Sequence, residues 1–388
     1  MSQAKDFIQK KLTERLQLGN FRVLKTALGL IDFCSNDYLG FAKSEQLKAL
    51  VQQELQKYPD YLNGSGGSRL LSGNTAFAEE LEQQIANFHQ AEAGLVFNSG
   101  YDANLGLFSS LPQRGDTIIA DELIHACIID GARLSLANRF SFKHNNLEDL
   151  EKKLKNTKGI CYVAVESVYS MDGDQAPLNA IIQLTKKYNA NLIVDEAHAT
   201  GVFGSGLVQM LNLENQVFAR TITFGKALGS HGAIVIGSQN LRDYLINFAR
   251  AFIYTTAPSF HQLMTTKMAY QLLKTSETEQ IQLQNSISFF KKELQKQHSI
   301  QLVPSDSAIQ SILVSGNSKV KKMADNLQKD GFDVRPILSP TVSIGMERLR
   351  ICIHAFNTEK EIIRLSLAVS NQLSANNYEP GTINHEPT

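Results

Sequence analysis

The chain has 388 residues, of which 43% are hydrophobic and 20% charged, and its 38 Lys and Arg balance its 38 Asp and Glu. This composition predicts a globular protein of two domains and excludes a disordered or fibrous one. The balanced charge favours neither nucleic acid nor membrane as a partner, and no stretch approaches the roughly 18 apolar residues that a membrane span needs.

The cysteines and the N-terminus indicate a reducing compartment. Cys34, Cys127, Cys161 and Cys352 are scattered, without metal-type or redox-type spacing. We therefore expect buried free thiols, no disulfides and no metal site. Because the first residues contain no apolar signal segment, we expect a cytoplasmic protein.

The chain begins with a predicted arm. Residues 3–18 form a polar helix with one apolar stripe, which is too short to be stable alone and must dock on the body or on a partner subunit. A strand at 30–34 then leads into the polar loop 35–40. Asn36 in this loop fits a plain turn as well as a binding site.

A glycine-rich loop at 63–73 follows, and its spacing fits neither the dinucleotide fingerprint nor a P-loop. An amphipathic helix is predicted at 76–90 and a strand at 94–98. Ser99, Gly100 and Tyr101 then form a tight turn into another helix. Free N–H groups and the helix dipole favour a phosphate at such a turn, although a plain strand-to-helix connection has the same pattern.

From residue 161 onward, strands alternate with helices. Buried strands are predicted at 161–165, 191–194 and 221–224, and the alternation implies a parallel sheet with right-handed crossovers. Ligands bind at the carboxyl ends of the strands in such sheets. The residues that follow these strand ends are Glu166, Asp195 and Lys226.

Lys226 lies on a glycine-punctuated loop between the strand at 221–224 and another at 233–236. Most lysines are solvated surface residues. Apolar strands on both sides instead indicate the protein interior, where desolvation lowers the pKa of a lysine and makes it a usable nucleophile. We predict that Lys226 forms a Schiff base with pyridoxal phosphate (PLP).

PLP also needs a carboxylate opposite its pyridine nitrogen, and Asp195 is the candidate. By itself Asp195 also fits a helix cap. His198 and Ser170 could reach the ring's phenolic oxygen, and Thr223 could reach the phosphate. His125 could stack on the ring, although a lone histidine near a helix start is more often a cap or a core residue.

Two other enzyme classes are less well supported. Residues 194–198 resemble the acidic box of a DEAH-type helicase, but that class requires a P-loop. Here Ala227 replaces the Ser or Thr after the lysine, and Arg220 occupies the leading glycine position. A serine hydrolase is unsupported because the chain has no Gly-x-Ser-x-Gly elbow.

The C-terminal part predicts a smaller α/β domain. We expect an extended segment at 251–258, helices over 261–297, strands at 309–314 and 349–353, and helices at 319–329 and 359–373. The predicted domains are an N-terminal arm at 1–40, a large PLP-binding domain at 41–260, a small domain at 261–375 and a flexible tail at 376–388.

Six motifs together resemble the α-oxoamine synthases, PLP enzymes of the aspartate-aminotransferase fold, known as fold type I. The resemblance covers residues 20–375. The motifs are Ser35-Asn-Asp-Tyr-Leu-Gly40, Gly66-Gly-Ser-Arg-Leu-Leu-Ser-Gly73, Ser170-Met-Asp-Gly-Asp174, Asp195-Glu-Ala-His-Ala-Thr-Gly201, Thr223-Phe-Gly-Lys-Ala-Leu-Gly229 and Arg348-Leu-Arg350.

The resemblance implies an α/β fold with a mostly parallel sheet in the large domain, and a homodimer whose sites lie at the subunit interface. It also implies decarboxylative condensation of a small amino acid with an acyl thioester. The most similar branch joins L-alanine to pimeloyl-CoA or a pimeloyl-carrier protein, giving 8-amino-7-oxononanoate for biotin synthesis. The alternative is the glycine-using branch, 2-amino-3-ketobutyrate CoA ligase, or another α-oxoamine synthase, and an aminotransferase is more distant.

The resemblance also implies residue roles. Lys226 would hold the cofactor and later remove the α-proton, Asp195 would pair with the pyridine nitrogen, and His125 would stack on the ring. His198 and Ser170 would contact the ring oxygen. The phosphate would be bound by Ser99, Gly100, Tyr101 and Thr223, and by Thr255 from the other subunit. Arg350 and Asn36 would bind the substrate carboxylate, and Arg22 would contact the acyl substrate. His144 could assist decarboxylation, and His231 replaces a small residue of many relatives and could alter acyl choice.

Overall fold

The computed structural model describes residues 2–26, 29–296, 300 and 302–375. The predicted flexible tail at 376–388 lies outside the described residues. Within them, no helix is both long and apolar enough to cross a bilayer. The chain forms two compact units, and each is described here by itself.

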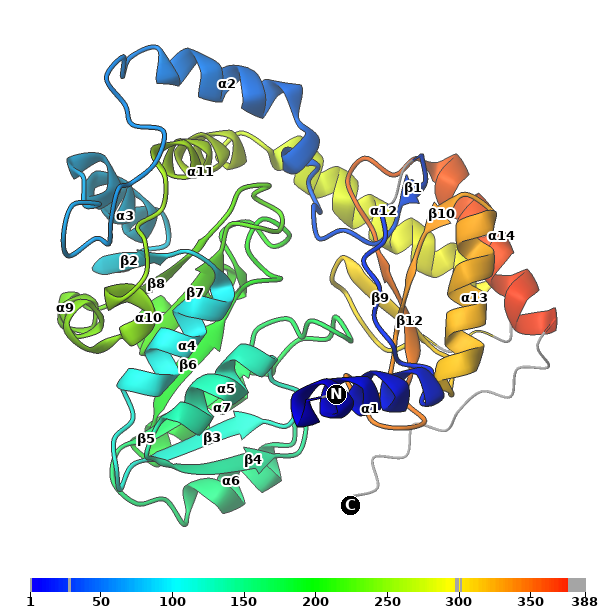
Figure 1. The fold of residues 1–388 in the computed structure, drawn as a ribbon, viewed down its shortest axis with the longest axis horizontal. Helices are drawn as coiled ribbons and strands as arrows, with labels where there is room; N and C mark the ends of the chain where they lie inside the picture. The colour runs from blue at the N-terminus through cyan, green and yellow to red at the C-terminus, as the bar shows by residue number, and fades with distance from the viewer. Residues whose placement is uncertain (1, 27–28, 297–299, 301, 376–388) are drawn as a thin grey trace. The chain divides into compact units, whose positions relative to one another are not determined.

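The larger unit comprises residues 36–170 and 174–283 and is built on a seven-stranded sheet (Figure 1). The strand order is β2-β8-β7-β6-β5-β3-β4. Strand β8 runs in the opposite direction to the other six strands. The strands are β2 (Ala93–Phe97), β3 (Thr117–Asp121), β4 (Asn138–Phe142), β5 (Cys161–Glu166), β6 (Asn191–Asp195), β7 (Ala219–Thr223) and β8 (Ala233–Gly237).

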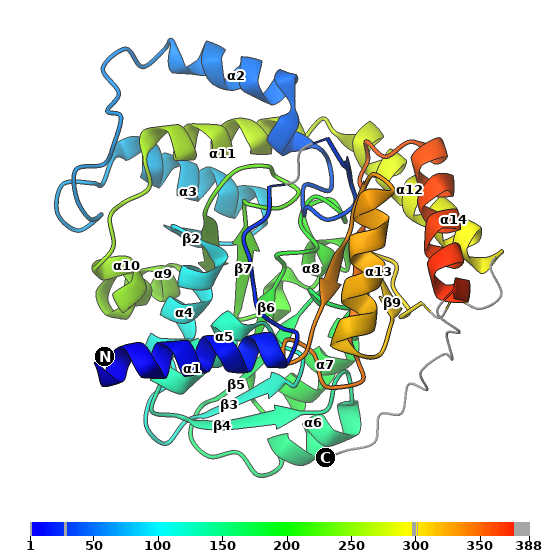
Figure 2. The same cartoon turned by 45° about the vertical axis from the view of Figure 1, so that its right-hand side comes forward.

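Helices cover both faces of this sheet (Figures 1 and 2). The helices of the larger unit are α2 (Glu45–Leu55), α3 (Ala76–Phe88), α4 (Gly100–Ser110), α5 (Ala126–Leu134), α6 (Leu147–Leu154), α7 (Leu178–Lys187), α8 (Leu207–Met210), α9 (Gln239–Phe248), α10 (Arg250–Ile253), α11 (Phe260–Leu273) and the first part of α12 (Glu277–Gln295), with short 3-10 turns at Phe41–Lys43 and Glu214–Gln216.

The strands are apolar throughout because their alternate side chains pack into two separate cores. Ile118, Tyr162 and Ile193 join a cluster with residues of α4, α5 and α9. Their neighbours Ile119 and Val163 join the opposite cluster with residues of α6, α7 and α8. A strand buried on both faces reads as a continuous hydrophobic run, which is why β5 and β6 are recognisable from the sequence.

The loop between β7 and β8 lies at the edge of the sheet where the parallel strands have their carboxyl ends. The two strands are consecutive and antiparallel, with Thr223 opposite Ala233. The loop between them therefore projects from the carboxyl end of β7. In the neighbouring strands Glu166 and Asp195 are register partners at the ends of β5 and β6. The topology thus brings Lys226 to the edge that carries these two carboxyl groups.

The smaller unit comprises the described residues of 1–35, 171–173 and 284–388. Its strands form an antiparallel sheet of order β11-β12-β9 and a parallel pair β1-β10. The elements are α1 (Gln3–Gln17), β1 (Ile31–Asp32), β9 (Ile309–Leu313), α13 (Asn317–Lys329), β10 (Phe332–Asp333), β11 (Arg335–Ile337), β12 (Arg348–Cys352) and α14 (Glu359–Ala375). Arg348 forms a salt bridge with Asp172, which ties the 171–173 segment to this sheet.

Several local predictions differ from the structure. The segment predicted as extended at 251–258 begins with the short helix α10, and Pro258 ends the irregular stretch after it. The helices predicted over 261–297 are present as α11 and α12. Strands β3 and β4 had no prediction, and β4 is an edge strand with only Phe142 buried, so it lacks an apolar pattern.

Candidate active site

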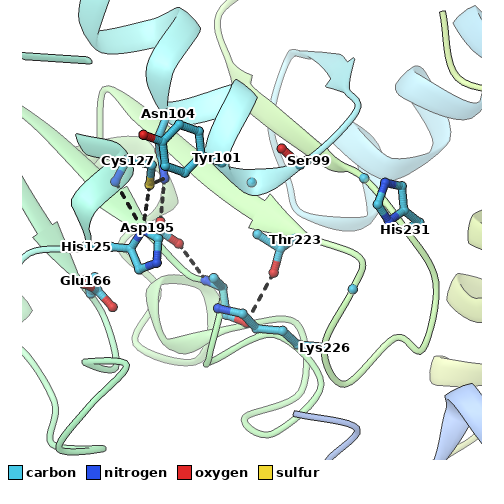
Figure 3. Close-up of a pocket in the computed structure, with 14 residues that line it drawn as sticks. Ser99, Tyr101, Asn104, His125, Cys127, Glu166, Asp195, Thr223, Lys226 and His231 are labelled. Carbon is cyan, nitrogen blue, oxygen red and sulfur yellow. Dashed lines mark hydrogen bonds between the residues drawn. The ribbon is translucent and has the colours of Figure 1, made fainter. Parts of the chain in front are cut away.

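A cavity of about 260 Å³ opens at the carboxyl ends of the strands (Figure 3). It brings together these predicted site residues: Ser99, Gly100, Tyr101, His125, Asp195, Thr223 and Lys226. The lining residues without a predicted role in the site are Asn104, Cys127, Glu166, Ala197, Gly225 and Gly232, together with His231, for which only an effect on acyl choice was predicted.

Asp195 is fixed by hydrogen-bond donors on both oxygens. Asn104 Nδ2 donates to Oδ2 at 2.7 Å, and the backbone N–H of Ala197 donates to Oδ1 at 2.8 Å. Thr221 Oγ1 in turn donates to Asn104 Oδ1 at 2.8 Å, which sets the orientation of the Asn104 amide. The arrangement presents one oriented carboxylate to the cavity.

Lys226 is held by a chain of hydrogen bonds through a histidine. Its Nζ lies 2.7 Å from His198 Nε2, and His198 Nδ1 lies 2.7 Å from Tyr38 Oη. His198 and Tyr38 are both buried. His198 is not among the residues that line the cavity, so its contact with a ring oxygen stays a prediction. The chain Tyr38–His198–Lys226 can move a proton to or from the lysine amine.

The start of α4 forms a cradle beside Thr223. Ser99 caps the helix, with its Oγ accepting from the backbone N–H of Asp102 at 3.0 Å. A Cβ on Gly100 would come within 2.6 Å of Thr223 Cγ2, so only glycine lets the helix end approach β7 this closely. The first N–H groups of a helix have no partner within it, and together with the helix dipole they attract an anion.

His125 lies at the start of α5 and is neutral. The Cys127 backbone N–H donates to His125 Nδ1 at 3.3 Å, and Cys127 Sγ lies 2.9 Å from the same nitrogen. Burial lowers the pKa of His125; Asp195 opposes this shift and Lys226 adds to it. Burial also raises the pKa of the Cys127 thiol to about 12. His125 therefore presents an uncharged ring to the cavity with its proton on Nε2.

Glu166 is a second carboxyl group in the same cavity. Its side chain is buried, and its Oε2 accepts from the backbone N–H of Ser170 at 3.0 Å. Burial first, and then the charge of Asp195, raise the pKa of Glu166 to about 8. The sequence placed Glu166 at a strand end but indicated no role for it.

The remaining predicted residues do not line the cavity. The backbone N–H of Ser170 donates to Glu166 Oε2, and Asn36 Oδ1 accepts from Tyr38 Oη at 3.1 Å. Thr255 Oγ1 accepts from Asn98 Nδ2 at 2.9 Å. The two predicted substrate arginines belong to the smaller unit, where Arg350 Nη1 lies 3.0 Å from Cys352 Sγ and the exposed Arg22 Nη2 lies 3.4 Å from Thr341 Oγ1.

His144 belongs to a separate cluster, the His144 cluster, made of Asp121, His144, Asn145, Tyr169 and Asp174. His144 Nδ1 lies 2.9 Å from Asp121 Oδ1, and Nε2 lies 2.7 Å from Asp174 Oδ2. Burial opposes the charged form, but hydrogen bonds and charge from the two carboxylates outweigh it and raise the pKa of His144 to about 10. His144 is not among the residues that line the cavity, and its role in decarboxylation stays a prediction.

Comparison with known proteins assigns the family. The model of the family described as aminotransferase class I and II matches residues 29–368. The chain belongs to this family. It is 45% identical over 361 residues to an 8-amino-7-oxononanoate synthase from Emericella nidulans, covering 86% of each chain. The predicted resemblance to α-oxoamine synthases is thereby confirmed.

Two solved structures of this family have the same fold. A serine palmitoyltransferase from S. paucimobilis with bound PLP–myriocin aldimine superposes with a TM-score of 0.88 at 26% identity, covering 97% of this chain and 99% of that one. An 8-amino-7-oxononanoate synthase from Francisella tularensis gives 0.78 at 29% identity, covering 90% and 99%. The predicted fold type I is confirmed, and this family member is a PLP-dependent acyltransferase of the α-oxoamine synthase type.

The cavity residues fit PLP in charge and shape. Lys226 supplies the amine and Asp195 the oriented carboxylate, while the Ser99–Tyr101 turn and Thr223 form the anion cradle that the close packing at Gly100 creates. His125, whose pKa burial lowers, offers a flat ring in the same cavity. These groups match the aldehyde, the pyridine nitrogen, the phosphate and the face of one aromatic cofactor.

Proposed function

We propose that the protein condenses L-alanine with a pimeloyl thioester, with loss of CO₂, to give 8-amino-7-oxononanoate. The observation that carries this proposal is the cavity with Lys226 and Asp195, in a chain that is 45% identical to a protein named for that product. The thioester is pimeloyl-CoA or pimeloyl-carrier protein. The four free cysteines agree with catalysis in a reducing cytoplasm.

The chain's own residues position the cofactor and move the protons. PLP, when bound, supplies an electron sink that stabilises negative charge at the amino acid's α-carbon. Asp195 would hold a proton on the pyridine nitrogen, and the positive charge there would increase the electron withdrawal by the ring. Lys226 Nζ accepts the α-proton, and His198 Nε2, at 2.7 Å, orients the amine and exchanges protons with it.

We further propose that Arg350, with Asn36, binds the amino acid carboxylate, because a guanidinium recognises a carboxylate through two parallel hydrogen bonds. Arg22 contacts the acyl substrate. Ser170 joins His198 at the ring oxygen. These assignments follow the family motifs in which the residues lie, and Arg350 lies on β12, next to the buried Leu349 and Ile351.

A homodimer completes the proposed site. Large apolar side chains remain exposed on the larger unit, among them Leu71 at 85%, Tyr254 at 72% and Leu70 at 50%. Leu70 and Leu71 lie on the glycine-rich loop, and Tyr254 adjoins Thr255. A second copy covering these side chains would account for their exposure and bring Thr255 to the partner's phosphate.

A second candidate uses a different amino acid. The solved serine palmitoyltransferase covers 97% of this chain at a TM-score of 0.88, so the same scaffold serves an enzyme named for serine and a palmitoyl group. The glycine-using branch shares the reaction type. These alternatives differ in the amino acid and the acyl chain only.

The test is a spectral titration of the PLP-loaded protein with alanine, glycine and serine, followed by thiol release with pimeloyl-CoA, acetyl-CoA and palmitoyl-CoA. We expect the alanine and pimeloyl-CoA pair to give the highest kcat/KM. Turnover only with glycine and acetyl-CoA, or only with serine and palmitoyl-CoA, would replace the proposed substrates. Pimeloyl-carrier protein, compared with pimeloyl-CoA, identifies the thioester donor.

A further inference from the structure

Two carboxyl groups lie side by side in the cofactor cavity, but they differ in the hydrogen bonds that they accept. Glu166 and Asp195 end adjacent parallel strands as register partners, and both line the cavity. Asp195 receives an N–H donor on each oxygen. On Glu166, Oε2 accepts from the backbone N–H of Ser170, and the backbone N–H of His125 also favours the anion, while the buried Oε1 has no hydrogen-bond partner among the described residues.

A buried carboxylate without compensation is unstable, so an unpartnered oxygen in such a place indicates a bound proton. No described cationic side chain forms a salt bridge with Glu166, and the nearby Lys226 amine is engaged with His198. The titratable groups that act on Glu166 or respond to its charge are Asp195, Lys226, Cys127 and Tyr169. Oε2 already accepts a hydrogen bond, which leaves Oε1 to carry the proton.

We propose that Glu166 is held as a neutral carboxylic acid with its proton on Oε1, so that Asp195 is the single anion among the side chains that line the cofactor cavity. Glu166 is a positioning residue in this scheme, since it also anchors the backbone of Ser170. Its ionisation would place a second negative charge beside Asp195 and weaken the binding of an anionic cofactor and a substrate carboxylate. The proposal rests on the chain being a PLP enzyme, and not on which substrates it uses.

The burial of Glu166 raises its pKa to about 8, so this proton is present at neutral pH and is lost just above it. Cofactor affinity and kcat/KM should therefore fall as the pH rises through about 8. Glu166→Gln keeps the size and neutrality of the side chain and cannot ionise. In this variant the alkaline fall should move upward by at least about one pH unit.

The experiment measures PLP affinity and kcat/KM from pH 6 to 10 for the wild type, Glu166→Gln and Asp195→Asn. An upward shift of the alkaline limb in Glu166→Gln, with PLP affinity at pH 7 of the wild-type order, supports the proposal. An unshifted limb overturns it, as does a loss of affinity at pH 7 as large as that of Asp195→Asn. Failure of the proposed substrates would leave the affinity data intact, so the two proposals fail separately.

Two readouts do not involve activity. The infrared spectrum of the full-length PLP-loaded protein at pH 7 should contain a carboxylic-acid C=O band that Glu166→Gln lacks. The unfolded chain loses the Glu166 proton near pH 4.5, whereas the folded chain keeps it to about pH 8. The wild type should therefore lose thermal stability relative to Glu166→Gln as the pH rises from 4.5 to 8, and no further above that. Parallel stability curves and an absent band overturn the proposal.

Discussion

The cofactor cavity and the His144 cluster place a histidine and buried carboxyl groups near the same edge of one sheet, with opposite results. In the cavity, His125 accepts hydrogen bonds on Nδ1, and burial lowers its pKa. In the cluster, His144 donates to a carboxylate from each ring nitrogen, and its pKa rises to about 10. The partners of the ring nitrogens, more than the depth of burial, decide the charge.

The two regions therefore have different duties. The cavity keeps a neutral His125 and an amine, Lys226, that can exchange protons with His198. The His144 cluster is a fixed ion pair network that joins the segment before His125 to the loop after β5, since Asp121 also accepts from the backbone N–H of Leu123 at 2.9 Å. We expect substitutions in the cavity to affect the chemistry, and substitutions in the cluster to affect stability.

The largest expected effect is that of Lys226→Ala. Removing the amine should lower turnover by at least about a thousandfold and abolish the visible absorbance of the lysine-bound cofactor. The unfolding temperature should change little, because Lys226 is a loop residue. Lys186→Ala, which removes an exposed lysine, is the control. Turnover and absorbance at the wild-type level would remove the lysine assignment.

Asp195→Asn should have the second-largest effect, a loss in kcat/KM of roughly 100-fold or more. The new amide can no longer hold a proton on the pyridine nitrogen. It also faces two N–H donors, from Asn104 and Ala197, with a single acceptor oxygen. Steady-state kinetics and PLP affinity measure the loss. Near-normal kinetics would show that another group faces the pyridine nitrogen.

His144→Gln should cost about 2 kcal/mol of folding free energy near neutral pH, because it leaves Asp121 and Asp174 without their shared cation. The pKa of His144 rises from 6.5 to about 10 on folding. Its stabilising contribution is therefore complete below pH 6.5 and is lost as the pH rises through 10. Denaturant unfolding at several pH values measures the difference from the wild type.

His261→Gln, at an exposed histidine, is the matched control and should leave stability nearly unchanged. A difference between His144→Gln and the wild type that grows with pH would contradict the assigned charge of His144. A large loss of kcat with normal stability would show that His144 acts in catalysis and does not serve stability alone. The contrast between the two regions would then be wrong.

The smallest expected effect is that of Thr223→Ala. It removes one hydroxyl from the cradle and should weaken PLP binding about three- to tenfold, the value of a single hydrogen bond. Thr265→Ala, at a half-buried helical position whose side chain bonds only its own helix and does not line the cavity, is the control. Unchanged PLP affinity would show that the N-terminus of α4 binds the phosphate without Thr223.

Many of the residues that line the cavity were predictable because they lie at strand ends or helix starts that the sequence pattern reveals. Lys226 and Asp195 follow apolar strands, and Ser99 begins a helix, so sequence neighbours alone place them at the edge of a parallel sheet. Thr223 and His125 were found the same way. The edge strand β4 and the short helix α10 were missed, since neither has an apolar pattern of its own.

Other features had no local signal. Asn104 lies in the middle of α4, and only the packing of that helix against the sheet brings its amide to Asp195. Cys127 resembled any buried thiol. Glu166 was visible as a carboxyl group at a strand end, but its unpartnered oxygen depends on which donors the neighbouring loops supply.

The amino-acid sequence by itself determined the fold class and the family, because these depend on strand patterns and motifs that are contiguous in the chain. It also predicted an amine and a carboxylate, Lys226 and Asp195, which the structure brings into one cavity. Only the tertiary structure decided which groups carry charge. The ionisation of Glu166, His125 and His144 depends on hydrogen-bond partners and burial supplied by residues that are distant in sequence, and no local pattern encodes that environment.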